Sequence, residues 1–168
     1  MIVVADPLAL RSKYCSPPTR WAIADKCCFE KMQAVEKKLV GALITRDGRL
    51  LLGLRSARKS TAPETWDVIG GHVEQRETFE AALRRELDEE VGIEPVEFYE
   101  HSRHAHEEFG TLVLFHVSRW THGEPRLCND EHVELRWFTI DEACRLPNLA
   151  ASEYVPVFRS LEVGGHGR

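Results

Sequence analysis

Residues 70–93 read GGHVEQRETFEAALRRELDEEVGI, and this stretch decides the fold more than any other part of the chain. Two glycines open it, a polar loop follows, and apolar residues then recur every three or four positions as far as Val91. That spacing is typical of an amphipathic helix. Thr78 suits its N-cap and Gly92 suits its end. The pattern therefore predicts a helix over residues 78–91, preceded by a loop.

Three glutamates crowd the second half of this helix. At about 100° per residue, Glu86 and Glu90 border the apolar stripe that includes Leu87, and Glu89 lies just beyond them. Carboxylates at the edge of a core repel each other and resist desolvation. Arg85 can offset one charge through an i,i+4 pair with Glu89. A hard cation such as Mg2+, which prefers oxygen ligands, neutralises more. A solvated acidic helix face is the other interpretation, but the position of the glutamates and the loop before the helix favour a divalent metal site.

The loop and the helix together have a fixed spacing. Gly71 is followed by five residues and Glu77, then by seven residues and Arg85-Glu86-Leu87, one residue and Glu89-Glu90, one residue and Gly92-Ile93. This spacing resembles the complete signature of the Nudix hydrolase family. Chain length and the lead-in of residues 66–71 resemble MutT-like members most. The looser resemblance extends over residues 38–161.

The resemblance implies an α/β fold, the Nudix α/β/α sandwich with a mixed central sheet. It also implies an enzyme that cleaves a pyrophosphate bond by water attack on phosphorus, in a nucleoside di- or triphosphate or a nucleoside-diphosphate-linked compound. Mg2+ or Mn2+ would be held by the glutamates Glu86, Glu89 and Glu90 and the carbonyl of Gly70.

Catalytic roles follow from the same resemblance. Arg85 would orient the glutamates, with Glu77 as its partner. Different members of the family use different carboxylates as the general base. Glu86 is one candidate in this chain. Glu131 and Glu134 are two others, in or after the loop that precedes the strand ending near residue 137. Both are equally well read as ordinary acidic loop residues.

Substrate-binding residues lie outside the signature. Arg55 and Arg58 follow a predicted strand, where related enzymes place an arginine that binds phosphate; a solvated loop is the other interpretation. His104 and His106 share a predicted strand face and are candidates for lining the pocket. MutT itself has proline where Ile69 stands and lysine where His72 stands, so the resemblance does not fix the nucleotide.

The rest of the chain predicts strands around this helix. Asp47-Gly48 is a strong hairpin signal between two apolar runs. The expected strands are residues 39–45, 50–54, 66–69, 95–106, 111–120 and 134–140, and a short helix over 141–145 and a last one over 152–161, capped by Ser152, complete the domain. Residues 1–36 form an extension of unknown role with a short helix near 25–37, residues 37–163 form the hydrolase domain, and 164–168 form a tail.

Composition limits the partners. The formal net charge is −5 and basic clusters are missing, which argues against general nucleic-acid binding. No apolar run approaches the roughly 20 residues of a membrane span, and the N-terminus does not resemble a secretory signal. We therefore expect a cytoplasmic monomer or homodimer that acts on a small-molecule nucleotide.

Two other functions share the expected fold. An enzyme like isopentenyl-diphosphate isomerase would need a catalytic cysteine in a strand motif, which we do not find. A non-catalytic nucleotide-sensing Nudix module usually has a damaged signature, whereas this one is intact.

Overall fold

The computed structural model describes residues 37–106 and 110–163, and the helix expected near residues 25–37 lies almost entirely outside them. Within these ranges six strands form one sheet: β1 (Lys38–Arg46), β2 (Arg49–Arg55), β3 (Trp66–Asp67), β4 (Glu94–His106), β5 (Gly110–Thr121) and β6 (His132–Thr139). The strand order is β3-β2-β1-β5-β4, and β6 pairs with β2. Strands β1 and β5 are parallel whereas the other pairs are antiparallel, so the sheet is mixed, as predicted.

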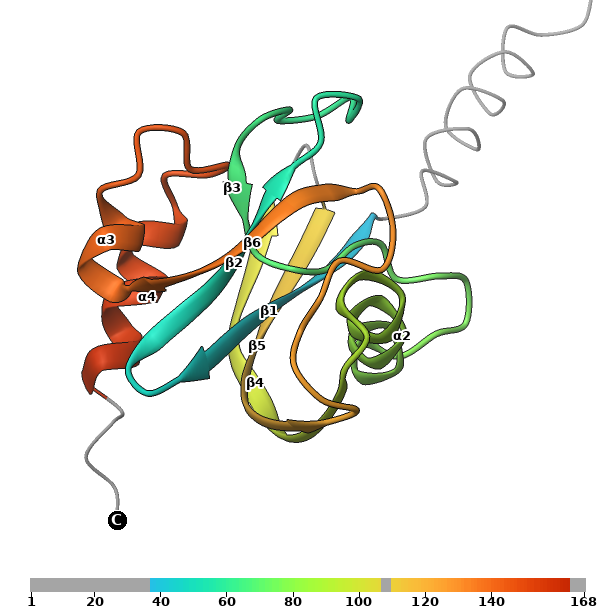
Figure 1. Cartoon of the computed structure of the whole chain (residues 1–168). Helices are drawn as coiled ribbons and strands as arrows, with labels where there is room; N and C mark the ends of the chain where they lie inside the picture. The colour runs from blue at the N-terminus through green and yellow to red at the C-terminus, as the bar shows by residue number, and fades with distance from the viewer. Residues whose placement is uncertain (1–36, 107–109, 164–168) are drawn as a thin grey trace, which may run out of the picture. The chain divides into compact units, whose positions relative to one another are not determined.

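Helices cover both faces of this sheet (Figure 1). Helix α2 (Phe79–Val91) lies on one face, and α3 (Ile140–Cys144) and α4 (Tyr154–Val163) lie on the other. The expected α/β/α sandwich is therefore confirmed. None of the helices in the described ranges is long and apolar enough to cross a membrane.

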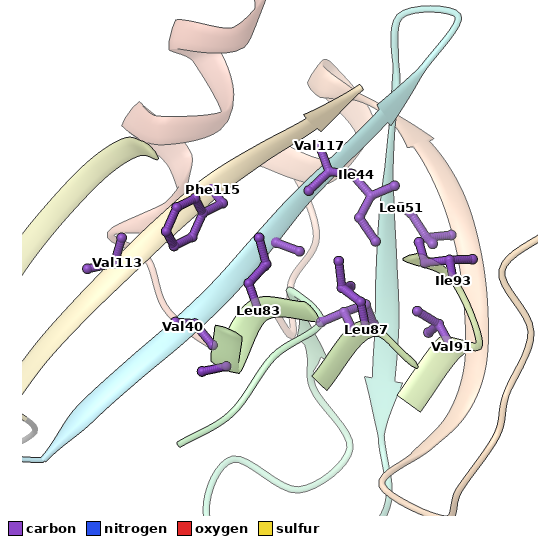
Figure 2. Packing of buried hydrophobic residues seen from close by; sticks show 13 residues of the cluster. Val40, Ile44, Leu51, Leu83, Leu87, Val91, Ile93, Val113, Phe115 and Val117 are labelled. Atoms are coloured by element: carbon purple, nitrogen blue, oxygen red, sulfur yellow. The ribbon is translucent and has the colours of Figure 1, made fainter. Parts of the chain in front are cut away.

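Each face of the sheet has its own core. Figure 2 shows Leu83, Leu87 and Val91 of α2 packed against side chains from β1, β2 and β5. The second core joins α3 and α4 to the alternate side chains of the same strands; Phe158 of α4 and Leu43 of β1 both belong to it. Burial of this apolar surface holds α2 in place, at about 25 cal/mol per Å² removed from water.

The local signals for the main elements are confirmed. The Thr78 hydroxyl accepts a hydrogen bond from the Ala81 amide at 3.1 Å, and Gly92 adopts the left-handed conformation with φ 68°. Both residues of the Asp47-Gly48 turn have positive φ, which gives a tight hairpin between β1 and β2.

Three predicted elements differ from the structure. The strand expected over 134–140 begins two residues earlier, at His132, and ends at Thr139. The strand expected over 66–69 is only Trp66–Asp67, although Ile69 still bridges to Ala42. The last helix begins at Tyr154 and the predicted cap at Ser152 is wrong. The Ser152 hydroxyl donates to Glu153 at 3.2 Å, and the first turn is held by backbone carbonyls instead.

Candidate active site

The site is built where the loop of residues 69–73 runs beside β1. The amide of Val40 donates to the Gly71 carbonyl at 2.9 Å, and the amide of Val73 donates to the Lys38 carbonyl at 2.8 Å. A Cβ on Gly70 would collide with the Val40 carbonyl. Glycine is therefore required for the loop to approach the strand this closely.

Helix α2 presents its carboxylates as its periodicity predicts. Glu86 is 9% exposed and Glu90 is 2% exposed, whereas the Glu89 side chain is 56% exposed. Charged side chains are rarely buried to this extent unless a partner compensates them. Two acidic groups at the edge of the core therefore need an explanation beyond packing.

Arg85 connects helix α2 to the loop that precedes it. Its Nε and Nη2 donate to the two carboxylate oxygens of Glu77, both at 3.0 Å, and Nη2 also donates to the His72 carbonyl at 2.9 Å. Its Nη1 donates to Glu86 at 2.9 Å and, at 3.4 Å, to Glu89. The expected pairing of Arg85 with Glu77 is present, and it lowers the pKa of the Glu77 carboxyl.

Glu86 lies against Gly71. A Cβ on Gly71 would stand 2.5 Å from Glu86 Oε1, so the glycine leaves the space that the carboxylate fills. Burial raises the pKa of Glu86 to about 7, the hydrogen bond from Arg85 opposes this shift, and the charge of Glu90 adds to it. A carboxyl group with a pKa near neutrality takes up or releases a proton easily at physiological pH.

Glu90 is the most deeply buried acid of the site. Neither of its carboxylate oxygens has a hydrogen-bond partner. A buried carboxylate without a partner is costly, and a bound cation removes that cost. The donor set of Glu86 and Glu90, all oxygen, fits Mg2+ or Mn2+. Within residues 37–106 and 110–163, no three His, Cys, Asp or Glu side chains already surround a common point. Glu89 is instead directed toward Arg85 and solvent.

The two arginines predicted to bind substrate are placed differently. Arg55 is largely buried: it pairs with Asp67 at 3.1 Å and donates to the carbonyls of Thr61 and Ala62. It therefore holds the loop after β2 closed. Arg58 is 83% exposed and contacts Asp130 only at 3.4 Å, so it remains available to a ligand.

Glu131 and Glu134, the acids outside the signature, make different contacts. The Glu131 side chain binds Lys59, and its carbonyl accepts from the Ser56 amide at 2.8 Å. Glu134 pairs across the sheet with Leu54, which packs in the α3 and α4 core, and it binds Arg136. The structure thus does not bring Glu134 to the face that carries Glu86 and Glu90.

His101 and His104 of β4 are also away from helix α2. His104 is exposed and contacts the Ser102 hydroxyl at 2.9 Å, and the side chain of His106 lies outside the described residues. His101 contacts Ser160 of α4 at 2.8 Å, on the opposite face of the sheet from α2. In the described part of the chain, His101 and His104 therefore do not join the carboxylates of helix α2.

His132 also faces the site, although the sequence did not predict it. This residue is 4% exposed, and its Nδ1 lies 3.3 Å from Glu90 Oε2. A bulge between Leu54 and Arg55 in the pairing of β2 with β6 leaves Val133 without a partner, so His132 and Glu134 point to opposite faces. The only signal in the sequence was a histidine beside Glu131, and nothing local predicts the bulge.

Comparison with known proteins agrees with this geometry. The family model of the NUDIX domain matches residues 36–161. The CTP pyrophosphohydrolase of Escherichia coli K12 is 36% identical over 110 residues, which span 66% of this chain and 81% of that protein. The oxidized purine nucleoside triphosphate hydrolase of Danio rerio is 31% identical over 63% of this chain and 68% of its own length.

Solved structures show the same fold. The MutT Nudix hydrolase of Burkholderia pseudomallei has a TM-score of 0.63 and 28% identity, covering 73% of this chain and 95% of that one. The E. coli ORF135 protein has a TM-score of 0.62 and 32% identity, covering 76% and 89%. The chain therefore belongs to the Nudix family, among its MutT-like members, and is a Nudix hydrolase. This confirms the hydrolase interpretation over the isomerase and the sensing module.

Proposed function

We propose that this enzyme is a Mg2+- or Mn2+-dependent pyrophosphohydrolase of nucleoside triphosphates. The observation that carries the proposal is Glu90, a carboxylate that is 2% exposed and has no hydrogen-bond partner on either oxygen, beside the buried Glu86. Two buried acids on one helix are costly in the free protein, and they suit a site that binds a divalent cation.

The residues that would hold the metal are Glu86, Glu90 and Glu89, with the carbonyl of Gly70 as a further ligand. Because Glu89 contacts Arg85 at 3.4 Å, it has to rotate on its exposed side chain to join them. When bound, the metal supplies Lewis-acid polarisation of the phosphoryl oxygens and lowers the pKa of its water.

The chain's own residues would position and move the proton. Arg85, anchored on both oxygens of Glu77, keeps Glu86 oriented through a 2.9 Å hydrogen bond. Glu86 is our first candidate for the base that takes a proton from the attacking water, since its buried carboxylate lies beside Glu90 and is held by the hydrogen bond from Arg85. Glu131 is the alternative, once Lys59 releases it. We assign no catalytic role to Glu134.

Positive charge for the phosphates would come from the loop after β2. Arg58 and Lys59 contact Asp130 and Glu131, immediately before the buried His132 that faces Glu90. Arg58 is the better candidate because it is exposed and only weakly paired. Arg55 already satisfies its guanidinium with Asp67 and backbone carbonyls, so we expect it to support the loop.

The test is a panel of nucleotides with Mg2+. It contains the four ribonucleoside triphosphates, their deoxy forms, an oxidised purine triphosphate and ADP-ribose. The assay scores pyrophosphate against phosphate release for the triphosphates, and AMP formation for ADP-ribose. The similarity to a CTP pyrophosphohydrolase makes CTP and dCTP the first candidates. We expect pyrophosphate release by the wild type and a loss of roughly a hundredfold or more in Glu90→Gln.

The matched control is Asp88→Asn, on the exposed face of the same helix. It should retain wild-type activity. A wild type that turns over no member of the panel, or a Glu90→Gln variant as active as Asp88→Asn, would contradict the proposed function.

A further inference from the structure

His132 occupies a space that the sheet provides for it. Gly53 lies opposite Leu135 in the pairing of β2 with β6, on the face of the sheet that carries α2. A Cβ on Gly53 would collide with the His132 ring. The imidazole therefore lies flat over a residue without a side chain, close to the backbone of β2, and extends toward helix α2.

The loop before β6 brings the ring to the end of that helix. The amide of Cys128 donates to the Glu90 carbonyl at 3.0 Å, and the amide of Arg126 donates to the Val91 carbonyl at 3.0 Å. These two bonds attach the chain to α2 a few residues before His132. The bulge at Val133 then directs the ring toward Glu90.

The contact between the two side chains is close but incomplete. Nδ1 of His132 and Oε2 of Glu90 are 3.3 Å apart, yet neither atom has a partner with the geometry of a hydrogen bond. A lone pair on Nδ1 would repel the carboxylate, whereas an N–H at Nδ1 attracts it. A small rotation of the ring would align that N–H with Oε2.

This pair is a poor choice for stability alone. A buried polar pair with unsatisfied atoms is less favourable than apolar side chains of the same shape. Metal-binding carboxylates, in contrast, are commonly held in orientation by a hydrogen bond from a neighbouring side chain.

We propose that His132 is a positioning residue for the metal site: its Nδ1–H holds Glu90 Oε2 and leaves Glu90 Oε1 directed at the cation. The inference rests on the proposed function, because it assumes that Glu90 binds metal. His132 itself contacts neither metal nor substrate in this arrangement.

The test measures Mn2+ binding by the electron paramagnetic resonance signal of free Mn2+, without substrate. His132→Leu fills the space and removes the donor, and should weaken binding by roughly ten- to a hundredfold. His132→Asn places an amide N–H near the position of Nδ1 and should bind close to the wild type. His132→Gln places its amide near Nε2 and should bind as weakly as His132→Leu.

His116→Leu is the matched control. His116 is a partly buried histidine on the opposite face of the sheet, bonded to the Thr45 hydroxyl at 2.7 Å. Its removal should leave Mn2+ binding unchanged. Since His132 acts through Glu90, adding His132→Leu to Glu90→Gln should weaken binding no further.

The outcomes separate the two proposals. If Glu90→Gln binds Mn2+ like the wild type, the proposed metal site itself fails. If Glu90→Gln loses Mn2+ while His132→Leu retains it, only the role of His132 is overturned. The same follows if His132→Asn is as weak as His132→Gln, a comparison that holds even where His132→Leu does not fold.

Discussion

The pKa of the Glu86 carboxyl is subject to opposing effects. Its side chain is buried beside Gly71 and near Glu90, yet Arg85 donates to it. Burial is the larger effect, and the pKa rises to about 7 from an ordinary value of 4.5. The folded, metal-free protein therefore holds this proton more tightly than the unfolded chain.

A pH dependence of stability follows. The contribution of Glu86 to folding is complete below pH 4.5 and is lost as the pH rises through about 7. In the presence of EDTA, the free energy of unfolding of the wild type, relative to Glu86→Gln, should fall between pH 5 and pH 7.5. Urea unfolding at a series of pH values measures this. A difference that is constant over that range would contradict it.

Arg85 is the residue with the most partners in the site. It reaches Glu77, Glu86 and Glu89 from one planar guanidinium, which a lysine cannot do. We expect Arg85→Lys to lower kcat roughly ten- to a hundredfold while KM for the nucleotide changes little.

Steady-state kinetics on the best substrate of the panel would measure this effect. Arg84→Lys is the control, since Arg84 contacts Glu94 and the Pro95 carbonyl on the neighbouring strand, away from the carboxylates. Equal kcat values for the two variants would refute an orienting role for Arg85.

At the scale of elements, the site depends on how closely the loop of residues 69–73 approaches helix α2. Backbone hydrogen bonds fix the loop to β1, and core packing fixes the helix over the same strand. Neither the loop nor the helix can move away easily. The space for the Glu86 carboxylate therefore exists only because Gly71 has no side chain.

Gly71→Ala should therefore displace Glu86. Its Cβ would stand 2.5 Å from Oε1, and the flexible carboxylate is the group that gives way. We expect Mn2+ binding to weaken roughly tenfold or more, with a much smaller change in the thermal midpoint. Titration with Mn2+ and thermal unfolding in EDTA measure the two effects. Unchanged Mn2+ binding would show that the glycine is not needed for this purpose.

For the whole molecule, metal binding and stability are linked. A ligand that binds only the folded state stabilises it by about 2.7 kcal/mol at a hundredfold excess over Kd. Mg2+ should thus raise the thermal midpoint of the wild type and of Asp88→Asn by several degrees, and EDTA should reverse the rise. Differential scanning fluorimetry over a Mg2+ series tests this. An equal rise in Glu90→Gln would exclude Glu90 as the main ligand.

The sequence by itself determined helix α2, its caps and the spacing of its glutamates, and the resemblance of that spacing to the Nudix signature implied the sandwich and the hydrolase class. These features are readable because a helical period and a capping residue act over a few neighbouring positions. The strand expected over 66–69 is shorter in the structure, because bridges to distant residues decide its pairing, and the cap at Ser152 is wrong, because backbone carbonyls hold the first turn of that helix.

Only the tertiary structure decided which residues outside the signature meet the carboxylates. Strand alternation alone would place His132 and Glu134 on one face, but the bulge at Val133 separates them, and His132 reaches Glu90. Likewise, the guanidinium of Arg55 forms an ion pair with Asp67 and hydrogen bonds to backbone carbonyls, which the sequence did not predict. Such placements depend on register and on contacts between residues far apart in the chain, which no local pattern encodes.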